Sequence, residues 1–560
     1  MGKINIQKML SEGAGRYVKK TADYVKRYGV KDLVAKTMEK YQRSADRYGE
    51  VYRKFLPAQE ELEAQEKEVF PNMPLISVVV PAYETEESYL RQMADSVLRQ
   101  TYANWELVVA DGSDSDKVEK VMEEYAGLPE SGRIRYIRLE DNAGISANTN
   151  EAIKQAAGEY IGFLDHDDFL ERNALYEMVK RINEAPQAEL FYSDEDKVSA
   201  DVSEYMQPHF KPDFNAELLR SNNYICHFLV TAKTLLDRVG FLNPEYDGAQ
   251  DYDLVLRCSE QAARIEHIAK ILYHWRIHDG STAVNTGSKL YAYEAGKNAI
   301  LAHLERIGEP QDVKLKADLG FYRVMYYDDN FRQLTVLIAE RQKEEPKELL
   351  ELKKIGVTVK YIASDTTPMV CMITTRYGLI LKKMSYLPKK KELAEMMGIL
   401  KRKEVAAVGT KSVSSNGRIL QNGLVFFENG LVRPAFEQLK KNYKGYMRRA
   451  ELTQYADGIS FSCAMIKKEA LEMTGGFLKR LPSDYRDMDF CLQLKKAGYK
   501  VVQDSYISVE AKEEQEYSRV EENQARLMLR ERWGAVLKNG DIFYNPNFDR
   551  GNAQFAIQAR

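Results

Sequence analysis

The chain has 560 residues, of which 44% are apolar and 29% charged, with 81 Lys and Arg against 84 Asp and Glu. At about 150 residues per domain this length predicts three or four domains, and the composition excludes disordered, collagen-like and coiled-coil proteins. The formal net charge of −3 argues against a dedicated nucleic-acid-binding protein, which normally carries a basic excess. We therefore expect a large globular protein without a nucleic-acid partner.

The five cysteines are far apart and include no Cys-x-x-Cys pair, which argues against a zinc ribbon or a disulfide framework. The N-terminus has no apolar signal-peptide core, and no window of about 18 residues is free of charge. We expect a cytoplasmic protein that contacts a membrane at most peripherally, on the inner face of the cell membrane.

Residues 1–72 form a separate N-terminal segment. Up to Pro57 this segment holds fourteen Lys and Arg against six Asp and Glu, and apolar residues such as Tyr17 and Tyr24 recur at helical spacing. The pattern predicts one or two basic amphipathic helices. Two interpretations remain open, a surface that docks onto anionic lipid headgroups and a helical hairpin packed on the next domain.

From Leu75 onward, short β-rich runs alternate with helical stretches. This alternation predicts βαβ units and a mostly parallel sheet with flanking helices. The predicted strands are 76–80, 105–110, 134–139 and 160–164, and the predicted helices lie near 90–98, 118–125 and 148–157. In such sheets ligands bind beyond the carboxyl ends of the strands. The residues at these ends are Pro81-Ala82-Tyr83, Asp111-Gly112-Ser113 and Asp165-His166-Asp167-Asp168.

The cluster from Asp165 to Asp168 follows the apolar run 160–164 directly. Carboxylate oxygens at a sheet edge suit Mg²⁺ or Mn²⁺, which bridge one or two carboxylates to substrate phosphates. The alternative is a turn in which Asp168 caps the next helix.

Six motifs in order resemble family 2 glycosyltransferases of the GT-A fold. They are 81–83, 110–113, 142–150, 163–168, 248–257 and 273–282. The resemblance covers about residues 73–310 and is closest to the bacterial branch that builds cell-surface polysaccharides, through 193–197 and 210–215. It implies a catalytic α/β domain with the nucleotide-diphospho-sugar transferase fold, a Rossmann-like, mostly parallel sheet. A dinucleotide-binding enzyme or nucleotidyltransferase is the weaker alternative, because no G-x-G-x-x-G or P-loop follows any strand.

The resemblance implies a nucleotide site at the carboxyl ends of the strands. Pro81 and Tyr83 would line the base pocket, and Asp111 would accept the N3–H of a uracil or thymine ring. Asp165 would contact the ribose or a metal-bound water. The chain departs from the family at Ala110, where many relatives carry a second acid.

The resemblance also implies a bound Mn²⁺ or Mg²⁺, with Asp167 as a direct ligand. His278 matches the histidine that many relatives place near the metal, whereas His274 matches the His-Trp-Arg run of the closer branch. Either histidine could be the ligand, and a packed core histidine remains the alternative for the other.

Asp251 matches the general base of the family. A base on the face of the sugar opposite the leaving group gives inversion of the anomeric configuration. The alternative for Asp251 is a helix N-cap, and we expect a structural role for Asp253 in the first turn of the same helix.

The candidates for the acceptor or sugar pocket rest on fewer signals. They are Asp194, Asp196, Asn223, Trp275 and Arg276. Solvated loop acids are the alternative for the two aspartates. Arg276 is a candidate diphosphate clamp, with an ion pair inside the fold as an equal alternative.

The second half resembles a further GT-A-like domain, which makes the fold a divergent duplication. Where the metal motif should follow the run 377–381, the chain has Lys382 and Lys383, whose ammonium groups would repel Mg²⁺. Asp487 still matches the base position. We expect a degenerate, non-catalytic domain; the alternative is that the two lysines neutralise a diphosphate in place of a cation. The predicted limits are 1–72, 73–310, 311–330 as a linker, 331–548 and 549–560 as a tail.

These observations predict an inverting, metal-dependent glycosyltransferase that moves a sugar from a UDP- or dTDP-sugar to a growing cell-surface glycan. The glycan would be of the capsule, O-antigen or wall polysaccharide type, and lipid-linked. The alternative is a non-catalytic glycan-binding or scaffold protein of a polysaccharide assembly complex. The enzyme is favoured because a scaffold would have no reason to keep all of Asp111, Asp165, Asp167 and Asp251.

Overall fold

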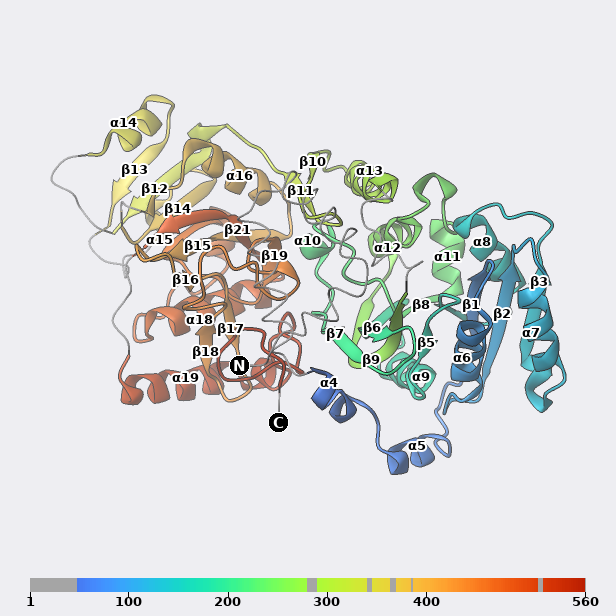
Figure 1. Ribbon diagram of the computed structural model, residues 1–560. Helices are drawn as coiled ribbons and strands as arrows, with labels where there is room; N and C mark the ends of the chain where they lie inside the picture. The colour runs from blue at the N-terminus through green and yellow to red at the C-terminus, as the bar shows by residue number, and fades with distance from the viewer. Residues whose placement is uncertain are drawn as a thin grey trace, which may run out of the picture.

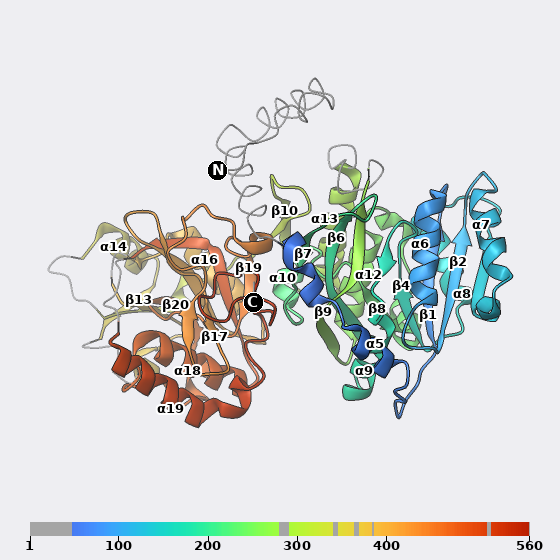
Figure 2. The same ribbon diagram turned by 60° about the horizontal axis from the view of Figure 1, so that its bottom comes forward.

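The computed structural model describes residues 48–278, 290–339, 345–362, 369–383, 386–511 and 517–558. It contains two α/β domains that lie side by side, each built around its own mixed β-sheet (Figure 1). The predicted basic helices fall mainly on residues 1–47, outside the described part of the chain. The N-terminal segment is described from α4 (Tyr48–Val51) and α5 (Gln59–Gln65), which lie along the first domain (Figure 2).

Four parallel strands form one half of the first sheet, in the order β3-β2-β1-β4. They are β1 (Ile76–Ala82), β2 (Trp105–Asp111), β3 (Ile134–Arg138) and β4 (Tyr160–Phe163), joined by α6 (Glu87–Leu98), α7 (Lys117–Ala126) and α8 (Ile145–Gln155). In α6 the buried residues Leu90, Met93, Ala94 and Val97 follow the i, i+3, i+4, i+7 spacing of one helix face. The predicted alternation of strands and helices is confirmed.

The other half of the sheet is mixed and continues as β8-β6-β9-β5. Its strand β8 is antiparallel to β4 and β6, whereas β6 and β9 run parallel to each other. The strands are β5 (Phe169–Leu170), β6 (Leu190–Ser199), β7 (Tyr205–His209), β8 (Leu229–Ala232) and β9 (Ile265–Ile277). The helices are α9 (Ala174–Glu184), α10 (Ala216–Leu219), α11 (Lys233–Val239), α12 (Gln250–Gln261) and α13 (Leu290–Arg306).

The second domain has its own mixed sheet in the order β13-β12-β14-β20-β15-β21-β19. Its strands are β12 (Leu334–Ile338), β13 (Thr358–Tyr361), β14 (Tyr377–Leu381), β15 (Val405–Val413), β16 (Ile419–Gln421), β19 (Thr453–Ala456), β20 (Cys463–Lys467) and β21 (Lys500–Glu510), with β17 (Leu424–Phe426) and β18 (Val432–Pro434) as a separate pair. Its helices are α14 (Lys347–Lys354), α15 (Met369–Met372), α16 (Lys390–Leu400), α17 (Lys468–Glu472), α18 (Ser483–Lys496) and α19 (Arg519–Leu537). Across the residues that the structure describes, we find no helix with the length and apolar character needed to cross a membrane.

The two sheets share the order of their central strands, because β2-β1-β4-β8-β6-β9 in the first matches β13-β12-β14-β20-β15-β21 in the second. The pairs β1–β4 and β12–β14 are parallel, β4–β8 and β14–β20 antiparallel, and β6–β9 and β15–β21 parallel. Tyr160 pairs with Ile76, and Tyr377 pairs with Leu334 at the equivalent position. Counting five residues onward from each tyrosine places Lys382 where the first domain has Asp165. The substitution of an acid by a lysine therefore falls at the equivalent sheet edge.

The domains share one hydrophobic core cluster, which includes Leu219 of the first domain and Tyr322. Tyr322 belongs to the hairpin of β10 (Asp312–Leu315) and β11 (Tyr322–Met325), so the predicted linker 311–330 is itself folded. Asn215 exchanges two hydrogen bonds with the backbone of Tyr455, at 2.9 and 3.0 Å. The first domain is thus fastened to the second by both apolar and polar contacts.

The C-terminal end of the chain packs back against the first domain. After α19, the Phe548 ring lies 5.6 Å from the Phe210 ring. Phe555, within the predicted tail, stacks on Phe436 of the second domain at 4.6 Å. The tail is therefore held between the domains.

Candidate active site

The carboxyl ends of β1, β2 and β4 meet at one edge of the first sheet, as expected for parallel strands. Pro81 is the penultimate residue of β1. Tyr83 is the first residue after this strand, and 44% of its surface is exposed. The loop from Asp165 to Asp168 follows β4 at the same edge. The predicted nucleotide and metal residues are thus brought to neighbouring loops.

Asp111, the predicted acceptor for the base, is fully buried at the end of β2. One carboxylate oxygen accepts the backbone N–H of Ser113 at 2.9 Å and its hydroxyl at 2.5 Å. The other accepts the Tyr136 hydroxyl at 2.8 Å and an Arg138 N–H at 3.0 Å. With four donors already in place, a uracil or thymine N3–H would have to displace one of them to reach Asp111.

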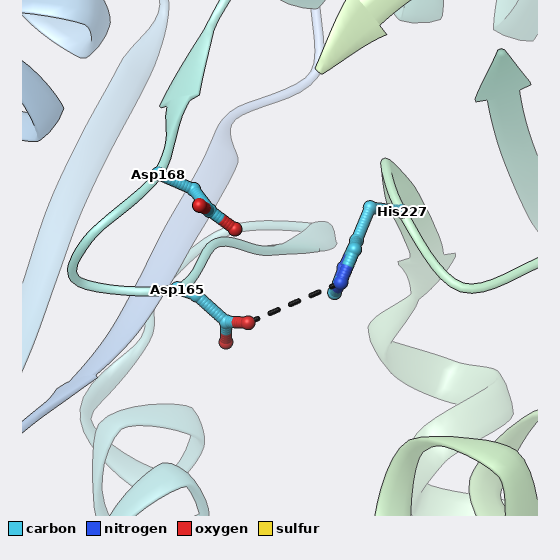
Figure 3. Close-up of side chains that lie close together, drawn as sticks. All are labelled: Asp165, Asp168 and His227. Carbon is cyan, nitrogen blue, oxygen red and sulfur yellow. Dashed lines mark ion pairs between the residues drawn. The ribbon is translucent and has the colours of Figure 1, made fainter. Parts of the chain in front are cut away.

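Three potential metal ligands converge beside the loop after β4 (Figure 3). The ligand atoms of Asp165, Asp168 and His227 all lie within 4.8 Å of one another, and the Asp165 Oδ2 to His227 Nε2 distance is 4.0 Å. Burial raises the pKa of Asp165 and Asp168 above the usual carboxyl range, and the nearby Asp167 carboxylate adds to both effects. A divalent cation would offset this repulsion, so oxygen and imidazole donors here fit Mn²⁺ or Mg²⁺.

Three structural contacts fix the shape of this site. Asp168 accepts the Tyr273 hydroxyl at 2.6 Å and the backbone N–H of Arg276 at 2.7 Å. The His227 ring stacks on the Tyr273 ring at 4.5 Å. Asp168 and His227 are therefore both held by residues of β9.

The two histidines of the run 273–282 lie in different places. His278 contacts Asp167, with 2.7 Å between Nε2 and Oδ2. His274 is buried, and its ring nitrogens face Asp196 at 2.6 Å and Glu171 at 3.3 Å. Burial alone would lower the pKa of His274, but these two carboxylates raise it to about 10. Both ring nitrogens of His274 are used inside the fold, so of the two candidates His274 takes the position of the packed core histidine.

Arg276 lies inside the fold, whereas Trp275 lies beside His227. The Arg276 guanidinium is buried and donates to the Asp167 carbonyl at 2.7 Å, the Ala200 carbonyl at 2.8 Å and the Gln92 side chain at 2.7 Å. It is held behind the acidic loop by uncharged acceptors, which matches neither an exposed diphosphate clamp nor the ion pair of the alternative. The Trp275 ring lies 6.0 Å from the His227 ring.

Asp251, the predicted base, lies in the first turn of α12 and is only partly buried. The Asn223 side-chain amide donates to its Oδ2 at 2.7 Å, so these two predicted residues are brought together. Burial raises the pKa of Asp251, against the opposing effect of His227. Asp253 accepts a hydrogen bond from Arg257 at 2.8 Å, the structural role expected for it.

Asp194 and Asp196 are not acids of an open acceptor pocket. Strand β6 extends through them to Ser199, and both are fully buried. Asp194 accepts from His267 at 2.9 Å, while Asp196 accepts the Tyr48 hydroxyl at 2.6 Å. The burial of both aspartates matches neither the acceptor role nor the solvated-loop alternative. Their partners come from distant parts of the chain, which the local sequence does not show.

His267 beside Asp194 gives a testable pH dependence. Burial alone would lower the pKa of His267, but Asp194 and Asp213 raise it to about 8 from the usual 6.5. This shift stabilises the fold by about 2 kcal/mol below pH 6.5 and is lost as the pH rises through 8. Urea unfolding of the wild type should show this loss, and His267→Gln should flatten it. An unchanged pH dependence in the variant would contradict the assignment.

His227 was not among the residues predicted from the sequence. Its loop is held by Lys211, whose ammonium donates to the Ile225 carbonyl at 2.6 Å and to the His227 carbonyl. The same ammonium lies 3.2 Å from Glu195, which also accepts the His227 backbone N–H at 3.1 Å. The charged motifs 193–197 and 210–215 therefore support the His227 loop. Their charged residues, Glu195 and Lys211, had no role in the sequence analysis and were the signal that could have pointed to this loop.

The chain is similar to a known protein family and to several known proteins. Residues 77–241 match the family described as Glycosyl transferase family 2. The chain is 33% identical over 476 residues to the uncharacterized protein y4gI of Sinorhizobium fredii, covering 77% of this chain and 52% of that protein. It is 28% identical over 469 residues to the O-antigen biosynthesis protein RfbC of Myxococcus xanthus, covering 77% of this chain and 36% of that protein. The chain thus spans about half of the first relative and about a third of the second.

Among solved structures, S. aureus TarS 1-349 in complex with UDP-GlcNAc aligns with 41% of this chain and 66% of its own, at 22% identity and a TM-score of 0.34. The mixed sheet and the acidic loop after β4 define the first domain as a glycosyltransferase domain of the GT-A-like α/β class. Residues 77–241 of this domain match glycosyl transferase family 2, and the chain carries a second α/β domain.

Proposed function

We propose that the first domain transfers a sugar from a UDP- or dTDP-linked donor to a growing cell-surface glycan, with inversion at the anomeric carbon. The observation that carries the proposal is that Asp251, the predicted base, interacts electrostatically with Asp165 of the acidic loop and with His227. The relationship to an O-antigen biosynthesis protein supports a surface polysaccharide as the product. A lipid-linked acceptor would place the reaction at the inner face of the cell membrane.

Asp251 has the position and environment of a general base. Burial raises the pKa of Asp251 above the ordinary value of 3.8. A general base works best when its pKa lies near the pH of the reaction, so this shift favours the role of a base. The Asn223 amide fixes one carboxylate oxygen, and the carboxylate would accept the proton of an acceptor hydroxyl. As Asp251 takes that proton, the hydroxyl oxygen bonds to the anomeric carbon and the bond from that carbon to the diphosphate breaks.

The residues that would hold Mn²⁺ or Mg²⁺ form two neighbouring sets. One is Asp165, Asp168 and His227; the other is Asp167 with His278. When bound, the cation supplies Lewis-acid stabilisation of the charge on the departing diphosphate. Arg276 holds the Asp167 carbonyl and thereby helps to fix the loop that carries the three aspartates of the two sets.

The test is release of nucleoside diphosphate from a panel of UDP-, dTDP- and GDP-sugars with Mn²⁺ or Mg²⁺. We expect metal-dependent release from a UDP- or dTDP-sugar and its loss in Asp165→Asn or Asp167→Asn. The variant with the larger fall in Mn²⁺ affinity, measured by calorimetry, identifies the set that binds the cation. Asp237→Asn, at an exposed position on α11, is the matched control and should retain activity.

The scaffold alternative makes the opposite prediction. It requires that no donor is hydrolysed and that calorimetry detects neither nucleotide nor metal binding to the wild type. That result would overturn the proposed function.

A further inference from the structure

Asn545, in the segment after α19, inserts its side chain into the first domain. Its amide nitrogen lies 2.9 and 3.1 Å from the two carboxylate oxygens of Asp194 and 2.8 Å from the Lys211 carbonyl. Asn545 is 2% exposed, and Asp194 and Lys211 are 0% exposed. A buried amide from the end of the chain thus completes a polar cluster inside the glycosyltransferase domain.

The contacts continue from this cluster toward the active site. Asp194 Oδ1 accepts the backbone N–H of Lys211 at 2.8 Å, so Asn545 holds Lys211 both directly and through Asp194. The Lys211 ammonium in turn bonds to the carbonyls of Ile225 and His227. His227 is the residue whose ring faces Asp165 across the candidate metal site (Figure 3).

The bonds of Asn545 to Asp194 and Lys211, and those of Lys211 to Asp194 and the Ile225 carbonyl, are buried, whereas the bond of Lys211 to the His227 carbonyl is partly buried. A buried donor or acceptor that loses its partner keeps its full desolvation penalty, so the cluster must rearrange when Asn545 is removed. The part free to rearrange is the segment 225–227, because Asp194 lies within strand β6 and is fixed by the sheet.

We propose that Asn545 is a positioning residue for the active site of the first domain, acting through Asp194 and Lys211 on the His227 loop. The second domain and its C-terminal segment would then be required for sugar transfer even without chemistry of their own. This inference rests on the proposed function only for its catalytic readout. The position of the loop can be tested without substrate or metal.

The first experiment is hydrogen exchange of the segment 224–229 in the full-length, metal-free protein. The His227 amide donates to Glu195 within the first domain, so its exchange reports the loop and not the docking of the C-terminal segment. In Asn545→Ala we expect exchange on the order of tenfold faster in this segment, the size associated with about one net hydrogen bond. Phe548→Leu is the matched control, because it loosens the same C-terminal segment through its aromatic packing but removes no hydrogen bond of the cluster.

The second variant, Asn545→Asp, keeps the volume but sets a carboxylate against that of Asp194. It should loosen the loop at neutral pH and recover toward wild-type exchange as the pH falls, because protonation of one carboxyl restores a donor. With an active wild type, Asn545→Ala should lower kcat more than it raises the KM for the donor.

Equal exchange of the segment 224–229 in wild type and Asn545→Ala would overturn the inference, as would an equal increase in Phe548→Leu. A wild type without donor turnover would contradict the proposed function instead, and the exchange result would still decide the role of Asn545.

Discussion

Asp251→Asn should lower kcat for sugar transfer by about 10²- to 10⁴-fold, the usual contribution of a general base. The amide has nearly the same shape as the carboxylate and can still meet Asn223, but it cannot take a proton from the acceptor hydroxyl. Donor binding should therefore survive, and calorimetry with the nucleotide together with a turnover assay separates the two effects. Loss of donor binding, or retained turnover, would remove Asp251 from the base role.

The equivalent aspartate of the second domain gives the matched control. Asp487 lies in the first half of α18 as a buried side chain, and it accepts the Phe461 backbone N–H at 2.8 Å. Asp487→Asn should leave transfer by the first domain intact. A comparable loss of turnover with an intact fold would contradict the prediction that the second domain is non-catalytic.

Lys211→Met should destabilise the first domain by about 3–5 kcal/mol, because it removes one partner of a buried ion pair and leaves the other charge uncompensated. Although burial alone would raise it, the Lys211 ammonium holds the pKa of Glu195 well below its usual range. The same substitution frees the Ile225 and His227 carbonyls, so Mn²⁺ affinity should fall together with stability. Urea unfolding and calorimetry measure the two effects.

A double variant tests whether the uncompensated charge is the cause. Adding Glu195→Gln to Lys211→Met removes the second charge, so the pair of substitutions should cost less than the sum of the single ones. Additive losses would show that packing of the lysine chain, and not the ion pair, is what stabilises this region.

The parallel part of the fold was accessible from the sequence because its signals are local. The β-rich run 76–80 and the helical spacing in 90–98 each specify one element without reference to the rest of the chain. The candidate roles of Asp165 and Asp251 followed from family motifs, and the Asp251 carboxylate is one of the charges that, after burial, raise the pKa of Asp165. The equivalence of Lys382 with Asp165 follows independently from strand register.

The residues whose surroundings were predicted wrongly make their contacts across long sequence separations. Asp196 takes partners from Tyr48, 148 residues earlier, and from His274, 78 residues later. No local pattern distinguishes such an acid from one in a solvated loop. His227 was missed for the same reason, because the side chains near its ring, Asp165, Asp168 and Tyr273, come from distant parts of the sequence.

The contact between Asn545 and Asp194 spans 351 residues of sequence. N-terminal domains begin to fold while the rest of the chain is still being made, at about 5–20 residues per second. On this scale the donor for Asp194 emerges roughly 20 to 70 s after the carboxylate that it serves. The buried network of the first domain therefore closes only after Asn545 has been synthesised, so a nascent chain that still lacks Asn545 carries an incomplete cluster around Asp194.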